Sequence, residues 1–216
     1  MAAIQAGTMN VLVEYILHHP PAKHETDVRK LRRSGRDLSI GGENDDDNRW
    51  LGRHQDMNSP GRITLHRARL CSAFWACIGD LQTSTTASTI QPHHHALCQS
   101  LIYMVITHER FHHFCDVIGT LAGYRGGERA SDEYKKDWQT EEALATVWEW
   151  QEVQRNFAPF ASLPEHVRSL WLDWWFDAIT AKGYCDWKLY SHSCFFKYKL
   201  ASHLIKEQAR LGANGF

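Results

Sequence analysis

Apolar residues recur at steps of three and four along much of this chain, which predicts a largely helical protein. Leu70, Phe74 and Ile78, for example, place one apolar face on a single helix. Residues 63–66 instead alternate apolar and polar side chains, as a short strand does. The helices are predicted at residues 10–18, 67–81, 92–118, 140–157, 164–181 and 184–211.

Loop signals separate these predicted helices. Residues 82–90 are rich in Ser and Thr, and residues 119–137 are rich in Gly and charged side chains, so both segments are predicted to be loops. Thr140 is a suitable N-cap for the next helix, because Glu141 and Glu142 would then lie in a first turn that favours acidic residues.

The amino-acid composition of the chain changes near residue 60. Residues 23–60 are mostly polar and include the acidic run 43–47, so the sequence predicts a polar N-terminal extension over residues 1–60, partly disordered or lid-like. Residues 61–216 carry most of the apolar periodicity and form the predicted main domain. The predicted fold class is therefore α+β and mostly α-helical.

The helix predicted at 92–118 carries the sequence His-Glu-Arg-Phe-His at residues 108–112. Side chains four residues apart lie on one face of a helix, so His108 and His112 can bind one metal ion together. Glu109 lies one residue along, close enough to act on a water molecule at that metal. Two imidazoles with a neighbouring carboxylate base are typical of zinc hydrolases.

A catalytic zinc site usually has three protein ligands, so a third is needed. Asp116 lies on the same helix face but one turn further on, and is better suited to orient an imidazole. A third His at the metzincin position is missing, since residue 118 is Ile. A carboxylate from a second, antiparallel helix is favoured, and Glu141 and Glu142 both remain candidates.

The His-Glu-x-x-His sequence followed by Glu142-Ala143-Leu144-Ala145 resembles the gluzincin class of zinc metallopeptidases, especially the small minigluzincins. The resemblance covers roughly residues 60–200 and implies a zincin-like fold with Zn²⁺ as cofactor. It implies that the Glu of Glu-x-x-Ala is the third ligand, which fits Glu142 best. It also implies a short edge strand that binds an extended peptide substrate by backbone pairing.

The resemblance also implies a mechanism. Zinc bound by His108, His112 and Glu142 would activate water, and Glu109 would act as general base and then protonate the leaving amine. The oxyanion would need a nearby donor. Tyr184, Tyr190 and His192 are the candidate donors, near the start of the last predicted helix.

Charge and composition limit the binding partners and the cellular compartment that we expect for this protein. The formal net charge of −1 predicts no general binding to nucleic acid or anionic membranes. No apolar run reaches the ~20 residues needed to cross a bilayer. No convincing signal peptide is present, and the six Cys form no Cys-x-x-Cys pair, so we expect reduced, largely buried thiols in a cytoplasmic protein.

Two other functions are compatible with the same residues. A non-catalytic binding or regulatory protein could use the metal only to fix its core and recruit a protein partner. Trp174 and Trp175 favour this, because neighbours on a helix differ by about 100° and one of them would form an exposed patch. A di-iron bundle is less well supported, because no second Glu-x-x-His accompanies residues 109–112.

Overall fold

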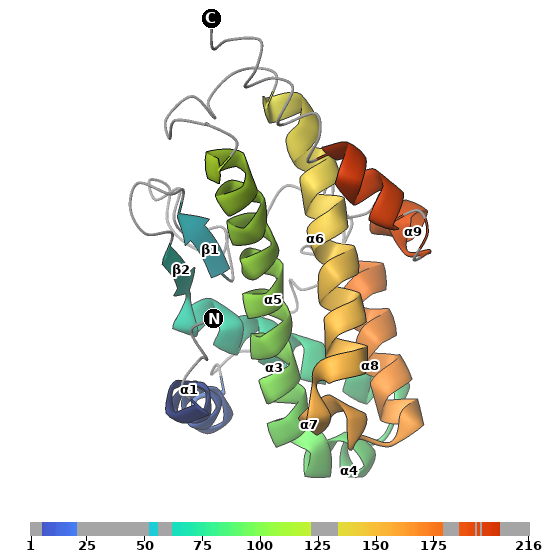
Figure 1. Cartoon of the computed structure of the whole chain (residues 1–216). Helices are drawn as coiled ribbons and strands as arrows, with labels where there is room; N and C mark the ends of the chain where they lie inside the picture. Colours follow the sequence, from blue (N-terminus) through green and yellow to red (C-terminus); the bar gives the residue numbers. More distant parts are fainter. Residues whose placement is uncertain are drawn as a thin grey trace, which may run out of the picture. The chain divides into compact units, whose positions relative to one another are not determined.

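The computed structural model describes residues 6–20, 52–55, 62–121, 134–178, 186–192, 194 and 196–203, and the described part is mostly helical (Figure 1). The elements are α1 (Ala6–His18), β1 (Gly52–Gln55), β2 (Arg62–Leu65), α3 (Arg67–Ser84), α4 (Ala87–Ile90), the 3₁₀ turn η2 (Gln91–His93), α5 (His94–Leu121), α6 (Tyr134–Asn156), α7 (Ala158–Ala161), α8 (Glu165–Ala178) and α9 (Trp187–Tyr190). A further helical stretch covers residues 196–203.

The chain divides into two compact units, and the first comprises residues 1–51, 65–105 and 152–180. Within this unit α3 packs against α1, α4 and α8. The apolar face predicted for α3 is buried, and Phe74 contacts the fully buried Trp171 of α8 with ring centroids 6.3 Å apart. Burial of such large side chains is the main stabilising contribution here.

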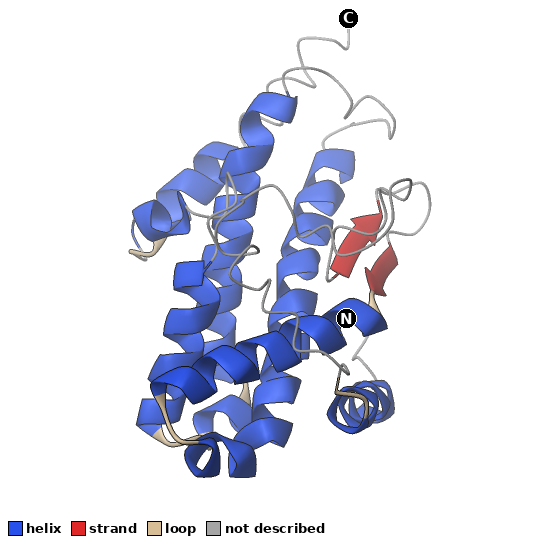
Figure 2. Cartoon of the chain, turned by 180° about the vertical axis from the view of Figure 1, so that it is seen from behind, coloured by secondary structure: helices blue, strands red, loops and turns tan. Residues whose placement is uncertain are grey.

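Helix α1 packs against α3 (Figure 2), and side chains of α3 bind backbone carbonyls at the C-terminal end of α1. The Trp75 indole donates a hydrogen bond of 2.8 Å to the Ile16 carbonyl, and the Cys71 thiol donates one of 3.0 Å to the His19 carbonyl. The last carbonyls of a helix have no partner within that helix, so α3 supplies the missing donors. Residues 21–51 and 56–61, the centre of the predicted lid-like extension, lie outside the described residues.

The second unit comprises residues 52–64, 106–151 and 181–216. Its part of α5 lies beside α6, and the two helices run antiparallel (Figure 1). Trp148 of α6 joins this pair to the last helical stretch, because its ring lies 5.8 Å from Phe111 and 6.3 Å from Phe196. Strands β1 and β2 pair in a two-stranded sheet, and β2 covers residues 62–65, near the predicted strand.

Several helix boundaries differ from the sequence predictions. Thr140 is not an N-cap, because α6 already begins at Tyr134 and the favourable acidic positions 141 and 142 lie in its interior. Most of the predicted loop 82–90 is helical, because α3 continues to Ser84 and residues 87–90 form α4, whose Ile90 is buried. The long helix predicted at 184–211 is interrupted after α9 at residues 191–192.

Two predictions about side chains can also be compared with the structure. Cys71, Cys77, Cys98 and Cys115 are buried and Cys194 is exposed, and none of these five described cysteines is part of a disulfide. The prediction that one of Trp174 and Trp175 is exposed is wrong, because both are half-buried and the Trp174 indole donates to Asp80 at 3.0 Å. In the part of the chain that the structure describes, no helix is long and apolar enough to cross a membrane.

Candidate metal centre

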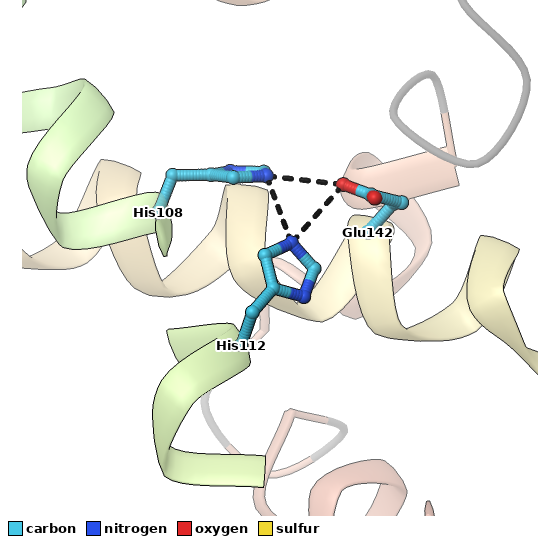
Figure 3. Close-up of side chains that lie close together, drawn as sticks. All are labelled: His108, His112 and Glu142. Atoms are coloured by element: carbon cyan, nitrogen blue, oxygen red, sulfur yellow. Dashed lines mark hydrogen bonds and ion pairs between the residues drawn. The ribbon is translucent and has the colours of Figure 1, made fainter. Parts of the chain in front are cut away.

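Three side chains from α5 and α6 meet at one point (Figure 3). His108 and His112 extend from successive turns of α5, and Glu142 reaches them from α6. The two Nε2 atoms lie 3.3 Å apart. Glu142 Oε2 lies 3.0 Å from Nε2 of His108 and 3.4 Å from Nε2 of His112.

These three distances fit a tetrahedral metal site. Ligand atoms about 2.0–2.1 Å from a central zinc ion, at tetrahedral angles, lie about 3.3 Å from one another. The triangle of Nε2, Nε2 and Oε2 has edges of 3.3, 3.0 and 3.4 Å. A zinc ion would therefore be accommodated with only small movements of the side chains. One tetrahedral position would remain for a water molecule or a substrate.

Each imidazole is also bound by a carboxylate on its other side. His108 Nδ1–H donates to Glu149 Oε2 at 3.2 Å, and His112 Nδ1–H donates to Glu141 Oε1 at 2.7 Å. An ionised carboxylate only accepts hydrogen bonds, and each ring has one on its Nδ1 side and Glu142 on its Nε2 side, so both nitrogens can donate while no metal is bound. A metal ion that replaces the Nε2 protons would leave each remaining proton on Nδ1, bound to Glu149 or Glu141, which is the tautomer that a metal requires.

The sequence of α6 explains why three carboxylates reach α5. Glu142 and Glu149 are seven residues apart, about two helical turns, so they share the face turned towards His108. The neighbouring Ala143 and Ala145 are fully buried. Their small side chains allow the α6 backbone to approach the rest of the unit closely, so that the flanking carboxylates reach the imidazoles.

Burial and charge together shift the titration of these groups. Burial by itself lowers the pKa of His108, but hydrogen bonds with Glu142 and Glu149 outweigh it and raise the pKa to about 9. The pKa of His112 is likewise raised well above its usual value, because Glu142 and Glu141 outweigh burial. Burial would raise the pKa of Glu142, yet attraction by His112 and hydrogen bonds from both rings lower it to about 2.

Three carboxylates therefore surround two imidazoles in a site that is largely shielded from water. The exposed fraction of the side chain is 8% for His108, 14% for His112 and 13% for Glu142, and it is lower still for Glu141 and Glu149. With both rings neutral, the cluster would carry three negative charges. Buried charge of one sign is costly, so the cluster favours either protons on the rings or a divalent cation between them.

The structure distinguishes the two candidates for the third ligand. Glu142 lies on the Nε2 side of both rings, whereas Glu141 lies behind His112 and contacts its Nδ1. Neighbouring residues on a helix point about 100° apart, which separates these two positions. Glu141 is thus placed to orient His112 and not to complete the same ligand triangle.

For the predicted general base, the imidazole-orienting Asp116 and the oxyanion donors, the structure gives mainly burial or backbone position. Glu109 is buried on α5, with an exposed fraction of 9%. Asp116 belongs to the backbone of α5, but its side chain lies outside what the structure describes, as does all of Tyr184. Tyr190 is half-buried near Lys199 and His192 is exposed, and no hydrogen bond from either to the ligand triangle occurs among the described residues.

Sequence reasoning missed two residues of this network. Glu149 carried a usable signal, because it lies seven residues after Glu142 on one predicted helix. His203 carried none, since it donates to Glu141 Oε2 at 3.2 Å across 62 residues of chain. Only the tertiary arrangement of the last helical stretch brings it there.

Comparison with known proteins adds no further assignment. The chain matches no protein-family model, no curated protein and no solved structure. The chemistry of the site therefore has to be argued from its own residues.

Proposed function

We propose that this protein is a zinc-dependent metallopeptidase. The observation that carries the proposal is the ligand triangle of His108, His112 and Glu142, whose edges suit tetrahedral zinc. The Nδ1–carboxylate hydrogen bonds behind both imidazoles support it, because such partners are usual for histidines that bind catalytic zinc. The likeness of residues 108–112 and 142–145 to gluzincins agrees with this reading.

In this proposal His108, His112 and Glu142 hold the ion and leave one position open. Zinc bound there would supply a Lewis acid that lowers the pKa of its water towards about 7 and polarises a substrate carbonyl. Glu141 and Glu149 keep the two imidazoles in the tautomer and orientation that the ion needs.

Glu109 is the proposed general base. It directly follows His108 on α5 and is buried, so its carboxylate would act in surroundings with little bulk water. It would accept a proton from the attacking water and pass that proton to the amine leaving group. Tyr184, Tyr190 and His192 remain the candidate donors to the oxyanion, which substitution of each in turn by Phe, Phe and Gln would test.

An extended peptide is the proposed substrate. The second unit holds the short strands β1 and β2, and in both whole-chain views they lie on the side of α5 away from α6 (Figures 1 and 2). A strand edge can pair with the backbone of an extended peptide whatever its side chains. We propose that one of these strands serves that role within a zincin-like arrangement.

The proposal is tested by measuring zinc content and peptide cleavage together. Purified protein should hold about one zinc ion in the triangle, lost in His108→Ala and Glu142→Ala. Glu109→Gln should retain the zinc and lose at least about 100-fold in cleavage of a peptide library, the usual scale for a general base. Glu152→Gln is the matched control, because its carboxylate accepts from Asn156 on the same helix and is not part of the ligand triangle.

One observation favours a second candidate, a metal-stabilised binding protein without catalysis. The triangle is largely buried, and its Glu142 together with the adjacent Glu141 already ties α5, α6 and the stretch 196–203 together, as a purely structural site would. In that case zinc would raise the unfolding temperature, but the wild type would cleave no peptide and Glu109→Gln would change nothing. Zinc-dependent cleavage that Glu109→Gln abolishes would exclude this candidate.

A further inference from the structure

A second cluster of ligating side chains lies behind the first site. Cys115, Glu141 and His203 each offer one ligand atom, and these three atoms all lie within 4.8 Å of one another. All three residues belong to the second unit and come from three separate segments: α5, α6 and the stretch 196–203. We propose that this cluster is a second metal site, with zinc as the natural occupant.

The orientation of Glu141 supports a separate site. Its Oε1 accepts the hydrogen bond from His112 Nδ1 at 2.7 Å, while its Oε2 points the other way and lies 3.2 Å from His203 Nε2. One carboxylate thus faces the first site with one oxygen and the second cluster with the other. A metal bound to Oε2 leaves the hydrogen bond to His112 intact.

The chemistry of the three donors suits zinc. Thiolate sulfur, carboxylate oxygen and imidazole nitrogen are all common zinc ligands, and a thiolate selects against hard cations such as Mg²⁺ and Ca²⁺. Cys115 lies about one turn beyond His112 on α5 and is not part of a disulfide, and its sulfur is one of the three clustered ligand atoms. Cys115 stands at the position where the metzincin pattern has Gly, and it is not a ligand of the first site.

Charge and burial favour a bound ion. Cys115, Glu141 and His203 have exposed fractions of 6%, 2% and 3%. A divalent cation with one thiolate, one carboxylate and one neutral imidazole forms a group with no net charge, which is the least costly kind to bury. The ion would fix the stretch 196–203 against α5 and α6, so its role is structural support for the face that carries His112.

Cobalt substitution distinguishes the two sites. Co²⁺ added to metal-free protein should bind at about two ions per chain, and only the thiolate of the second site can give sulfur-to-cobalt charge-transfer absorption. Cys115→Ser should abolish that absorption and remove one ion. His108→Ala should remove one ion and leave the absorption unchanged. Cys194→Ser, at an exposed cysteine of the same unit, is the control and should change neither.

The inference does not require the first site to be catalytic or even occupied. One ion per chain without charge-transfer absorption would overturn it while leaving the metallopeptidase proposal intact. Absorption that persists in Cys115→Ser would also overturn it, because another thiol would then be the ligand. Should that variant not fold, X-ray absorption of the zinc-loaded wild type decides the question: a Zn–S distance of about 2.3 Å is expected, and its absence refutes the site.

Discussion

Each imidazole of the ligand triangle is oriented by a hydrogen bond from its Nδ1 to a carboxylate of its own. Glu149 binds His108 and Glu141 binds His112, so both rings already turn Nε2 towards the common point before any ion arrives. This arrangement reduces the reorganisation needed on binding, because neither ring has to rotate and each has only to lose its Nε2 proton. Metal affinity should therefore depend on residues that never touch the metal.

Glu149→Gln tests this dependence. The amide can still accept from His108 Nδ1–H, but it lacks the charge that makes the imidazole a stronger ligand. We expect zinc affinity to fall about 10- to 100-fold, as for other partners of metal-binding histidines. Competition with a chromophoric chelator measures the change, with Glu152→Gln on the same helix as the control. Equal affinities in the two variants would mean that Glu149 does not support the site.

Some residues of the site can be predicted from spacing along one helix, whereas others can be assigned only from contacts between helices. His108 and His112 follow from helical spacing alone, because four residues along one helix fix their common face. The choice between Glu141 and Glu142 could not be made that way, since it depends on how α6 is rotated against α5. Contacts between helices, not periodicity along one helix, decide such a choice.

At the scale of elements, the apolar pattern predicted α3, α5, α6 and α8 but not their ends. Helix α6 begins six residues before Thr140, so a good N-cap residue lies unused in its interior. Capping contributes only about 1 kcal/mol, which tertiary packing of the whole helix can easily outweigh. The apolar pattern also does not predict the interruption at residues 191–192, because apolar residues continue on both sides of it.

The attachment of α1 to α3 gives a prediction at this scale. Trp75→Phe removes the indole donor and leaves the Ile16 carbonyl without that partner. A buried carbonyl that loses its partner costs about 1–3 kcal/mol, so the free energy of unfolding should fall by that amount. Urea denaturation followed by circular dichroism measures it. Zinc content should be unchanged, because α1 and α3 belong to the first unit and the ligand triangle to the second.

Trp171→Phe is a suitable control for this substitution, since Trp171 also belongs to the first unit and its indole nitrogen has no hydrogen-bond partner among the described residues. A loss of stability similar to that of Trp75→Phe would attribute the effect to the smaller ring and not to the bond with Ile16. Unchanged stability in Trp75→Phe would show that α1 contributes little to the first unit. Either result would weaken the account of how the N-terminal helix is held.

At the scale of the whole molecule, the ligand triangle couples folding to protons and, in the proposed zinc protein, to metal binding as well. His108 has its pKa raised from 6.5 to about 9, so its contribution to stability is complete below pH 6.5 and is lost as the pH rises through 9. Glu142 has its pKa lowered from 4.5 to about 2, so its contribution is complete above pH 4.5 and is lost as the pH falls towards 2. Without metal, this cluster therefore stabilises the protein most between pH 4.5 and pH 6.5, where both contributions are complete.

Zinc should reverse the trend above pH 6.5. The ion requires neutral imidazoles, so it competes with the proton that His108 binds tightly, and that competition weakens as the pH rises. Between pH 6.5 and 9 the metal-free protein should lose stability, on the order of 3 kcal/mol from His108 alone at 1.4 kcal/mol per pKa unit. Stabilisation by excess zinc should grow over the same range.

Thermal unfolding with a chelator and with excess zinc, across this pH range, provides the measurement. The two unfolding temperatures should diverge as the pH rises, because loss of the proton removes an attraction in one sample and frees a ligand in the other. In a Cys115→Ser background, which lacks a ligand of the second proposed site, His108→Ala should make the two curves run parallel, since it removes both the proton and the ligand. Parallel curves in the wild type would mean that metal and proton do not compete at this imidazole, and the ligand triangle would then lose its role as a zinc site.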